Sequence, residues 1–247
     1  MDLLSPVTLS VSVAAMFLGG AAAGAAGFGM GMVALPFMLL VLDPVTAVLT
    51  LNTTQILLFL MILRDARSQV QTGEAKPMTL LGLAGAVVGV FALTATAEAA
   101  IRLTAVSVIL VLSVITAAAP MHRFRVPSRA GPPLGFAAAV LLGAMAFGGP
   151  VMALYALGRG WAKNSVRGTL ALYFLAVTGA LAVGYAVAEL YSAERWVFIG
   201  IAQGPVLVGA LLGTRLAHAM SDHIFRKSVL ALIIASSLAV LVKELAA

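Results

Sequence analysis

The chain has little charge for its length and no cysteine. Only 10% of its 247 residues are charged, whereas 62% are hydrophobic. A water-soluble domain is about one quarter charged, so this chain cannot cover a water-facing surface with polar groups. The composition therefore indicates an integral membrane protein. The lack of cysteine excludes disulfides, thiolate metal sites and cysteine chemistry.

Basic residues outnumber acidic ones, but their places do not suggest binding to nucleic acid. The net charge is +6 and the pI is near 10.2, yet Lys and Arg lie in short loops between apolar runs, where they set membrane topology. Histidine is scarce, and His122, His218 and His223 lie in loops without metal-ligand spacing. We therefore expect no nucleic-acid partner, no metal and no cofactor.

Carboxylates are missing from the middle of the apolar runs. The acidic residues stand at segment ends or turns, as Asp43 and Glu98 do. Proton-driven carriers often need an intramembrane carboxylate. Because the apolar runs have none in their middle, the sequence contains no evident proton relay. Without cysteine, a histidine cluster or paired carboxylates in the core, an intramembrane enzyme is also disfavoured, and we expect no enzymatic activity.

Apolar runs of about twenty residues without period-2 alternation predict helices rather than barrel strands. The first run lacks preceding basic residues and is longer than a signal-peptide core, so we expect it in the mature protein. Two pieces are too short to cross a bilayer, because eleven helical residues rise about 16 Å. The long segments are 7–27, 45–63, 78–97, 101–119, 133–147, 167–188, 196–216 and 225–243, and the short ones are 32–42 and 151–158.

The order of segments repeats once along the chain. "GAAGFGMGMVAL" (24–35) aligns with "GAMAFGGPVMAL" (143–154), and six positions are identical 119 residues apart. Chance matching of Ala, Gly and Leu is the alternative, but two broken motifs at one spacing favour a duplication. Further on, Gly85, Gly89 and Arg102 align with Gly209, Gly213 and Arg226. We expect a first repeat at 1–121, a cytoplasmic linker at 122–132 and a second repeat at 133–247.

Loop charge orients the two repeats. Lys and Arg mark cytoplasmic loops, and they gather in the loops that follow residues 63, 119, 158 and 216. This pattern predicts that the second repeat has the inverted orientation in the membrane and that 133–158 forms a re-entrant hairpin. By symmetry 7–42 forms another, although 7–27 is long enough to span alone. The expected fold is an all-α polytopic membrane protein with two inverted-topology repeats, whose discontinuous helices or re-entrant hairpins meet at the midplane.

Glycines and a proline break the backbone where the two hairpins turn. Inverted repeats with broken helices are the plan of many secondary transporters, and irregular backbone at that depth is tolerated where it is buried or lines a cavity. Two helix N-termini facing one another would form an anion site. The alternative is that glycines only allow close packing, which we favour for Gly85/Gly89 and Gly209/Gly213. The predicted tip residues are Phe28, Gly29, Met30, Gly31, Phe147, Gly148, Gly149 and Pro150.

A few polar residues inside apolar segments complete the candidate site. Polar side chains in lipid seek partners, and Arg167 is either a substrate contact or an interfacial residue of the positive-inside pattern. The other candidates are Asn52, Thr53, Gln55, Thr169, Tyr173 and Gln203.

The motifs "GFGMGMVALPFMLL" and "FGGPVMALYALGRGWAKNSVRGTLALYF", with "LVGALLGTRLAHAMSDHIFRKSVLALIIASSL" near the end, resemble the sulfite exporter TauE/SafE family. The resemblance covers nearly the whole chain. It implies a bacterial inner-membrane carrier of sulfite, sulfoacetate or other organosulfonates. Met30 departs from the family, which often continues with glycine there, and could alter substrate choice.

The sequence therefore predicts a multi-pass transporter of the bacterial inner membrane that exports a small sulfur-containing anion by alternating access. Membrane potential would drive anions outward. An uptake symporter or facilitator for a related anion is the alternative, and a non-transporting subunit would leave the broken motifs without a purpose. A homodimer is left open.

Overall fold

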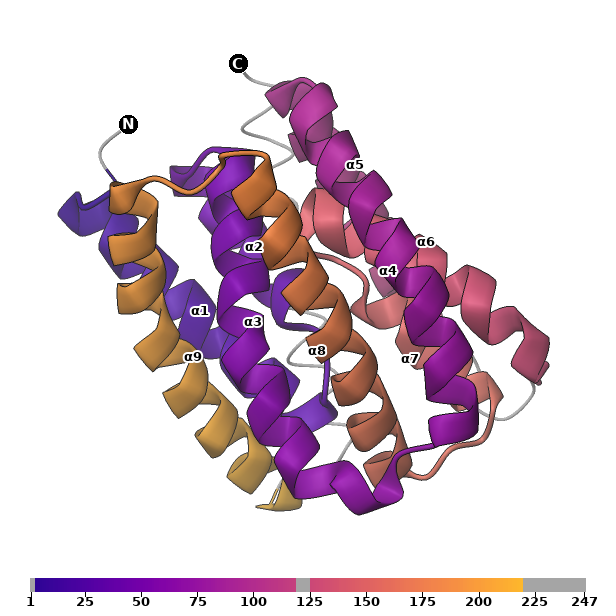
Figure 1. Ribbon diagram of the computed structural model, residues 1–247. Helices are drawn as coiled ribbons and strands as arrows, with labels where there is room; N and C mark the ends of the chain where they lie inside the picture. Colours follow the sequence, from indigo (N-terminus) through magenta and orange to yellow (C-terminus); the bar gives the residue numbers. More distant parts are fainter. Residues whose placement is uncertain (1–2, 119–124, 220–247) are drawn as a thin grey trace.

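The computed structural model describes residues 3–118 and 125–219, and these ranges contain helices and loops but no strand (Figure 1). The predicted all-helical class is therefore confirmed. The predicted segment at 225–243 lies outside the described residues. The helices are α1 (Pro6–Ala26), α2 (Met30–Val41), α3 (Pro44–Ala66), α4 (Thr72–Ala95), α5 (Glu98–Ala118), α6 (Gly131–Met145), α7 (Gly149–Gly158), α8 (Lys163–Val187) and α9 (Ala193–Ala219), with short 3₁₀ turns at Arg67–Gln69 and Ser128–Ala130.

Five described helices, α1, α3, α4, α8 and α9, are long and apolar enough to cross a membrane, and α2 and α7 are short apolar helices. The prediction of a multi-pass membrane protein is confirmed. The largest difference in a boundary is at α4, which begins at Thr72 rather than at residue 78, and α8 begins at Lys163 rather than at residue 167. The polar start of α4 is held by other elements: the Gln71 N–H donates to Thr169 Oγ1 at 2.9 Å, and Glu74 pairs with Arg159 at 2.6 Å.

Ion pairs and hydrogen bonds gather the helix ends into two groups at opposite ends of the molecule. At one end, which we call the Glu194 end, the Leu3 N–H donates to Glu194 and the Arg195 Nε donates to Thr46 Oγ1 at 3.0 Å. Arg102 at the start of α5 donates to the Leu42 carbonyl just after α2, at 2.8 Å. The starts of α1, α3, α5 and α9 and the end of α2 therefore lie together.

The opposite end, which we call the Arg159 end, holds a second group of helix termini. Glu74 at the start of α4 pairs with Arg159, which follows α7. The Val126 N–H, shortly before α6, donates to the Gly158 carbonyl at the end of α7, at 2.9 Å. The ends of α3 and α7 therefore lie with the starts of α4, α6 and α8.

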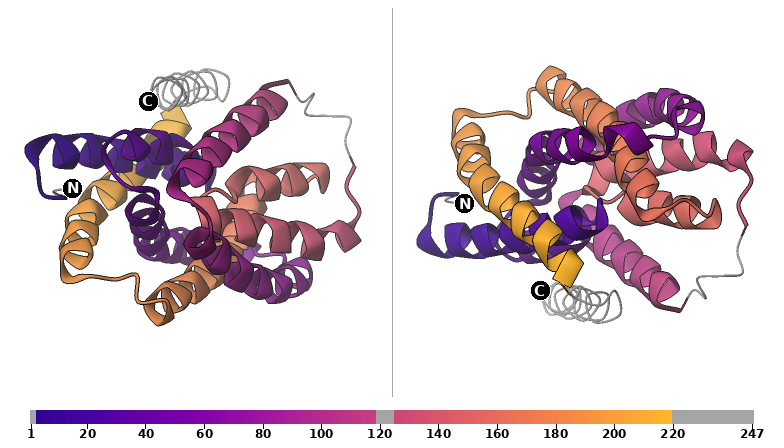
Figure 2. Two further views of the ribbon diagram at one scale, coloured as in Figure 1. Left: turned by 90° about the horizontal axis from the view of Figure 1, so that it is seen from above. Right: turned by 90° about the horizontal axis from the view of Figure 1, so that it is seen from below.

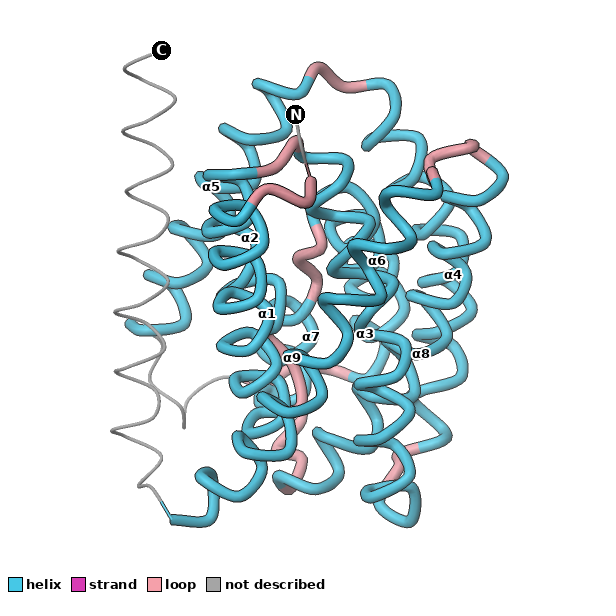
Figure 3. The backbone as a smooth tube through the Cα atoms, turned by 90° about the vertical axis from the view of Figure 1, so that its left-hand side faces the viewer, coloured by secondary structure: helices cyan, strands magenta, loops and turns pink. Residues whose placement is uncertain are grey.

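It follows that α1–α2 and α6–α7 are two hairpins whose outer ends lie at opposite ends of the molecule. Seen along the long axis, the indigo α1 lies on one side and the pink α6 and α7 on the other (Figure 2). Loop segments lie within the body of the molecule as well as at its ends (Figure 3). The turns of the two hairpins, where the broken motifs fall, are buried at 146–148 and buried to half-buried at 27–29.

Close backbone packing holds each hairpin against a long helix. α1 packs along α9, α4 packs along α6, and α3 packs along α8 between them. A Cβ on Gly89 would lie 2.9 Å from the Val140 carbonyl oxygen of α6, and a Cβ on Gly213 would meet the Ala21 carbonyl oxygen of α1. The packing role predicted for these glycines is confirmed, because a side chain at either position would push two helices apart.

Candidate functional site

The chain turns sharply at the tip of each hairpin. α1 ends at Ala26 and is followed by Gly27 with φ 85°, and α2 begins after Gly29 with φ 96°. α6 ends at Met145 and is followed by Ala146 with φ 53°, and α7 begins after Gly148. Glycine adopts these left-handed conformations without steric cost, whereas Ala146 does so at some cost in strain. The turn residues therefore let each pair of helices fold back within a few residues.

The N-termini of α2 and α7 face one another across a short gap. A Cβ on Gly149 would lie 3.3 Å from the Gly29 nitrogen and 3.3 Å from the Phe28 ring. A Cβ on Gly31 would meet the Ala146 carbonyl oxygen. No side chain caps either helix, because both N-cap residues are glycines. The first N–H groups of both helices consequently have no partner within their own helix.

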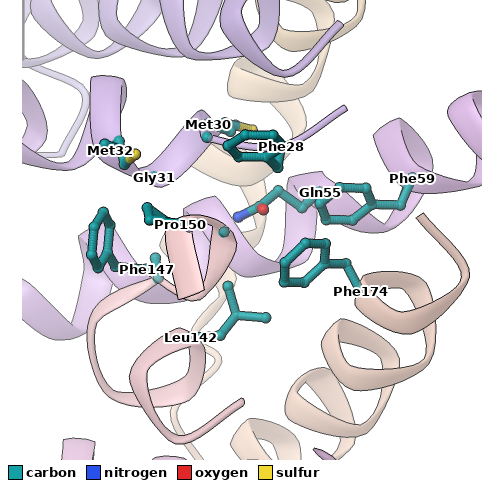
Figure 4. A pocket seen from close by; sticks show the side chains of 13 residues that line it. Phe28, Met30, Gly31, Met32, Gln55, Phe59, Leu142, Phe147, Pro150 and Phe174 are labelled. Carbon is teal, nitrogen blue, oxygen red and sulfur yellow. The ribbon is translucent and has the colours of Figure 1, made fainter. Parts of the chain in front are cut away.

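A cavity lies at this meeting point and is walled by both hairpins, α3 and α8 (Figure 4). Its empty volume, mouth included, is about 250 Å³. The sequence candidates that line it are Phe28, Gly29, Met30, Gly31, Gln55, Phe147, Gly149 and Pro150. The lining residues that the sequence reasoning missed are Met32, Phe59, Leu142, Ala146 and Phe174.

Of the described residues that line the cavity, Gln55 is the one with a polar side chain. It is 3% exposed, and its Nε2 donates to the Leu51 carbonyl of its own helix at 3.1 Å. An amide side chain has two donors and an acceptor oxygen, so a second N–H is left for a ligand. In Figure 4 the Gln55 amide reaches toward Pro150, between the aromatic rings.

Aromatic and methionine side chains make up most of the remaining wall. Phe59 of α3 and Phe174 of α8 stack with ring centroids 5.1 Å apart and planes 21° apart. Phe59 stands four residues after Gln55, and this spacing puts both on one face of α3. The spacing alone could therefore have identified Phe59 as a lining residue. Phe174 could not be predicted as a lining residue from the sequence, because no sequence pattern shows that α3 packs against α8.

Asn52 lies outside the cavity lining and ties three helices together. Its Nδ2 donates to the Leu142 carbonyl of α6 at 2.8 Å and to the Tyr185 hydroxyl of α8 at 2.9 Å. The Tyr185 hydroxyl in turn donates to the Gly143 carbonyl at 2.7 Å. Both amide hydrogens of Asn52 are thus engaged, and they hold the last turn of α6 beside the cavity.

The remaining polar candidates also join helices away from the cavity. Thr53 and Tyr191 share a hydrogen bond of 2.8 Å, and burial raises the pKa of the Tyr191 hydroxyl. Gln203 donates to the Thr54 carbonyl at 3.3 Å, so α9 is linked to α3.

Two further candidates form hydrogen bonds between helices near the Arg159 end. Thr169 accepts from the start of α4, and the Tyr173 hydroxyl donates to the Gly135 carbonyl. Gly148 contacts α6 closely, since a Cβ there would meet the Ala138 carbonyl oxygen. None of the three lines the cavity.

Arg167 lies near the first hairpin tip without lining the cavity. The residue is 8% exposed, and its Cγ would be 2.9 Å from a Cβ on Gly27. Its Nη1 is 3.5 Å from Asp65 Oδ2, whereas its buried Nε has no hydrogen-bond partner among the described residues. The stem of a buried cation therefore lies against Gly27 at the tip, and its guanidinium is incompletely paired.

Metal binding finds no support in the part of the chain that the structure describes. Residues 3–118 and 125–219 contain no group of three or more His, Asp or Glu side chains placed to hold a metal ion. What the described residues do bring together is a pair of uncapped helix N-termini, one amide side chain and an apolar wall.

Fold and site together define a multi-pass membrane protein with two buried helix breaks around a cavity. Residues 12–240 match the model of the family described as sulfite exporter TauE/SafE, and the chain belongs to that family. It is a family of membrane transporters rather than enzymes. No curated protein and no solved structure matches the chain.

Proposed function

We propose that the protein exports a small sulfur-containing anion, sulfite or an organosulfonate, which binds between the N-termini of α2 and α7. The observation that carries this proposal is the meeting of two uncapped N-termini at one cavity. Each N-terminus carries about half a positive charge and free N–H donors, and helix N-termini are recurrent sites for oxyanions.

The chemistry of the wall supports an anion over a cation. Within residues 3–118 and 125–219, the lining includes no carboxylate that would repel an anion and no Lys or Arg that would hold it permanently. Gln55 adds a neutral donor beside the helix ends. Phe and Met side chains keep water away, which strengthens each electrostatic contact. Partial charges and one amide suit a substrate that must be released after every cycle.

Two inverted repeats account for the arrangement of the hairpins. The left-handed turns at Gly27 and Ala146 are 119 residues apart, and so are the N-cap glycines Gly29 and Gly148. The contact of Gly85 with the Phe136 carbonyl matches that of Gly209 with the Phe17 carbonyl, where the two glycines are 124 residues apart and the two phenylalanines 119. If the two repeats exchanged conformations, the cavity would open first to one side of the membrane and then to the other, which is alternating access.

The charge of the two ends supports the orientation. Arg64, Arg67, Arg125 and Arg159 belong to loops or helix termini at the Arg159 end, which we propose is cytoplasmic by the positive-inside rule. In this orientation α6–α7 is re-entrant from the cytoplasm and α1–α2 from the outside of a bacterial inner membrane. Membrane potential would expel an anion at about 2.3 kcal/mol per charge per 100 mV. An uptake symporter or facilitator on the same scaffold is the alternative.

Transport and binding assays test the proposal. Purified protein is titrated calorimetrically with sulfite, sulfoacetate, isethionate and thiosulfate, and with choline as a cation. We expect at least one sulfur anion to bind and choline to show no heat of binding. Counterflow in proteoliposomes with reversed gradients then separates export from uptake. Binding of choline with rejection of every sulfur anion would refute the proposed site.

A further inference from the structure

The seam between α3 and α8 leads from the cavity toward the Arg159 end. On α8, Arg167 precedes Phe174 by seven residues, which is two helical turns and about 10 Å. On α3, Asp65 follows Phe59 and lies in the last turn of the helix. Phe59 and Phe174 both line the cavity, whereas Arg167 and Asp65 form their ion pair outside it. The seam therefore carries an aromatic pair inside and a charged pair outside.

Arg167 has few hydrogen-bond and ion-pair partners for a buried cation. Its side chain is 9% exposed, its Nε has no partner among the described residues, and its ion-pair partner Asp65 has a side chain that is 66% exposed. A buried donor without an acceptor is costly, and an ion pair with an exposed carboxylate is weak. An oxyanion that reached this point would satisfy the free N–H and compete with Asp65 for the guanidinium.

The stacked Phe59–Phe174 pair lines the cavity where the α3–α8 seam reaches it, two helical turns along α8 from Arg167. The two rings lie at 5.1 Å and offer no hydrogen bond to an ion. An apolar constriction of this kind stops ions until its side chains move apart. The Cα, Cβ and Cγ of Arg167 also lie against Gly27 at the hairpin tip, so this residue stands beside the element that delivers the N-terminus of α2.

We propose that Arg167 is an outer anion-binding residue, which exchanges Asp65 for the transported oxyanion at the mouth of the α3–α8 seam, and that Phe59 and Phe174 form the gate between this residue and the cavity. The proposal rests on the proposed function for the identity of the anion. It adds the route that the anion takes and the residue that selects its charge.

Cysteine labelling tests the route, because the native chain has no cysteine. Gln55→Cys places a thiol in the cavity. It is labelled with 2-sulfonatoethyl methanethiosulfonate, an anion, and with the 2-(trimethylammonium)ethyl reagent, a cation, in membrane vesicles of each orientation. Ser68→Cys, in the exposed turn after α3, identifies the vesicles that present the Arg159 end.

We expect labelling of the cavity thiol from the Arg159 end. Arg167→Gln should lower the ratio of anionic to cationic labelling rates by about tenfold, and Arg167→Lys should retain most of it. Arg64→Gln, which removes an exposed charge from the same helix end, is the control and should leave the ratio unchanged. Asp65→Asn should raise the ratio, since Arg167 then lacks its competitor. Phe59→Ala should raise both rates.

An unchanged ratio in both Arg167→Gln and Asp65→Asn would overturn the anion-binding role. Rates unaffected by Phe59→Ala, or a thiol that reacts solely from the Glu194 end, would overturn the route. These results are independent of the substrate. If sulfur anions are transported normally while the ratio does not change, only the seam proposal fails. If the ratio changes while no sulfur anion binds, the proposed function fails and the route stands.

Discussion

Gly149→Ala is the sharpest perturbation of the two helix N-termini. It adds one methyl group that would lie 3.3 Å from the Gly29 nitrogen and 3.3 Å from the Phe28 ring, with no contact under 3.0 Å. The fold should therefore accept it after shifts of a few tenths of an ångström. Alanine also favours helix over glycine, by up to about 1 kcal/mol. The substitution should crowd the site without unfolding the protein.

The loss in affinity follows from the hydrogen bonds that the methyl group displaces. An oxyanion oxygen accepts from an N–H at about 2.9 Å, which is the space that the methyl group takes beside Gly29. Losing one hydrogen bond to a charged group costs about 1.5–3 kcal/mol, or about ten- to a hundredfold in Kd. Gly179→Ala is the matched control, because a Cβ on this α8 glycine has open space around it.

Isothermal titration of the two variants with the best-binding sulfur anion measures the difference. We expect Gly179→Ala to bind like the wild type and Gly149→Ala to bind about ten- to a hundredfold more weakly, with the same elution profile and melting temperature within a few degrees. Wild-type affinity in Gly149→Ala would show that the N-termini do not hold the anion, and the site would have to be sought elsewhere in the fold.

Three further predictions follow from the same contacts. Gln55→Ala removes the polar group of the cavity wall and should weaken anion binding about tenfold or more without lowering the melting temperature, and an unchanged Kd would count against a ligand role. Asn52→Ala removes the two hydrogen bonds to the Leu142 carbonyl and the Tyr185 hydroxyl and should lower thermal stability by about 1–3 kcal/mol, so intact stability in a melting scan would contradict the anchoring role. In vesicles, single cysteines at Ser68 and Ala162 should react from one face and a cysteine at Ser192 from the other, and labelling of the first two from opposite faces would refute the arrangement of the hairpins.

The hairpin tips could be predicted from the local sequence, because the backbone conformation there restricts which residues are allowed. Gly27 and Gly29 adopt positive φ, and glycine at such places is a property of a few consecutive residues. Helix length and hydropathy are local in the same sense, which is why the short helices α2 and α7 were placed within a few residues. The start of α4 was misplaced because it depends on Glu74 reaching Arg159, 85 residues away.

Polar residues inside apolar helices were harder to interpret. Asn52 and Gln55 lie one turn apart on α3, and both need partners in an apolar environment. The sequence could not tell them apart, since their roles depend on which helix faces each side chain. Asn52 faces α6 and Tyr185, whereas Gln55 faces the cavity.

The sequence alone determined that this protein is a helical membrane protein, where its backbone breaks and which family it resembles, because composition, glycine and chain order are readable residue by residue. Only the tertiary structure decided that the two N-termini meet at one cavity, that Phe59 stacks on Phe174, and that Arg167 stands incompletely paired beside the first tip. These features arise from the packing of α3 against α8 and of each hairpin against a distant helix. Contacts between residues a hundred positions apart are set by how helix surfaces fit together, and no local pattern encodes that fit.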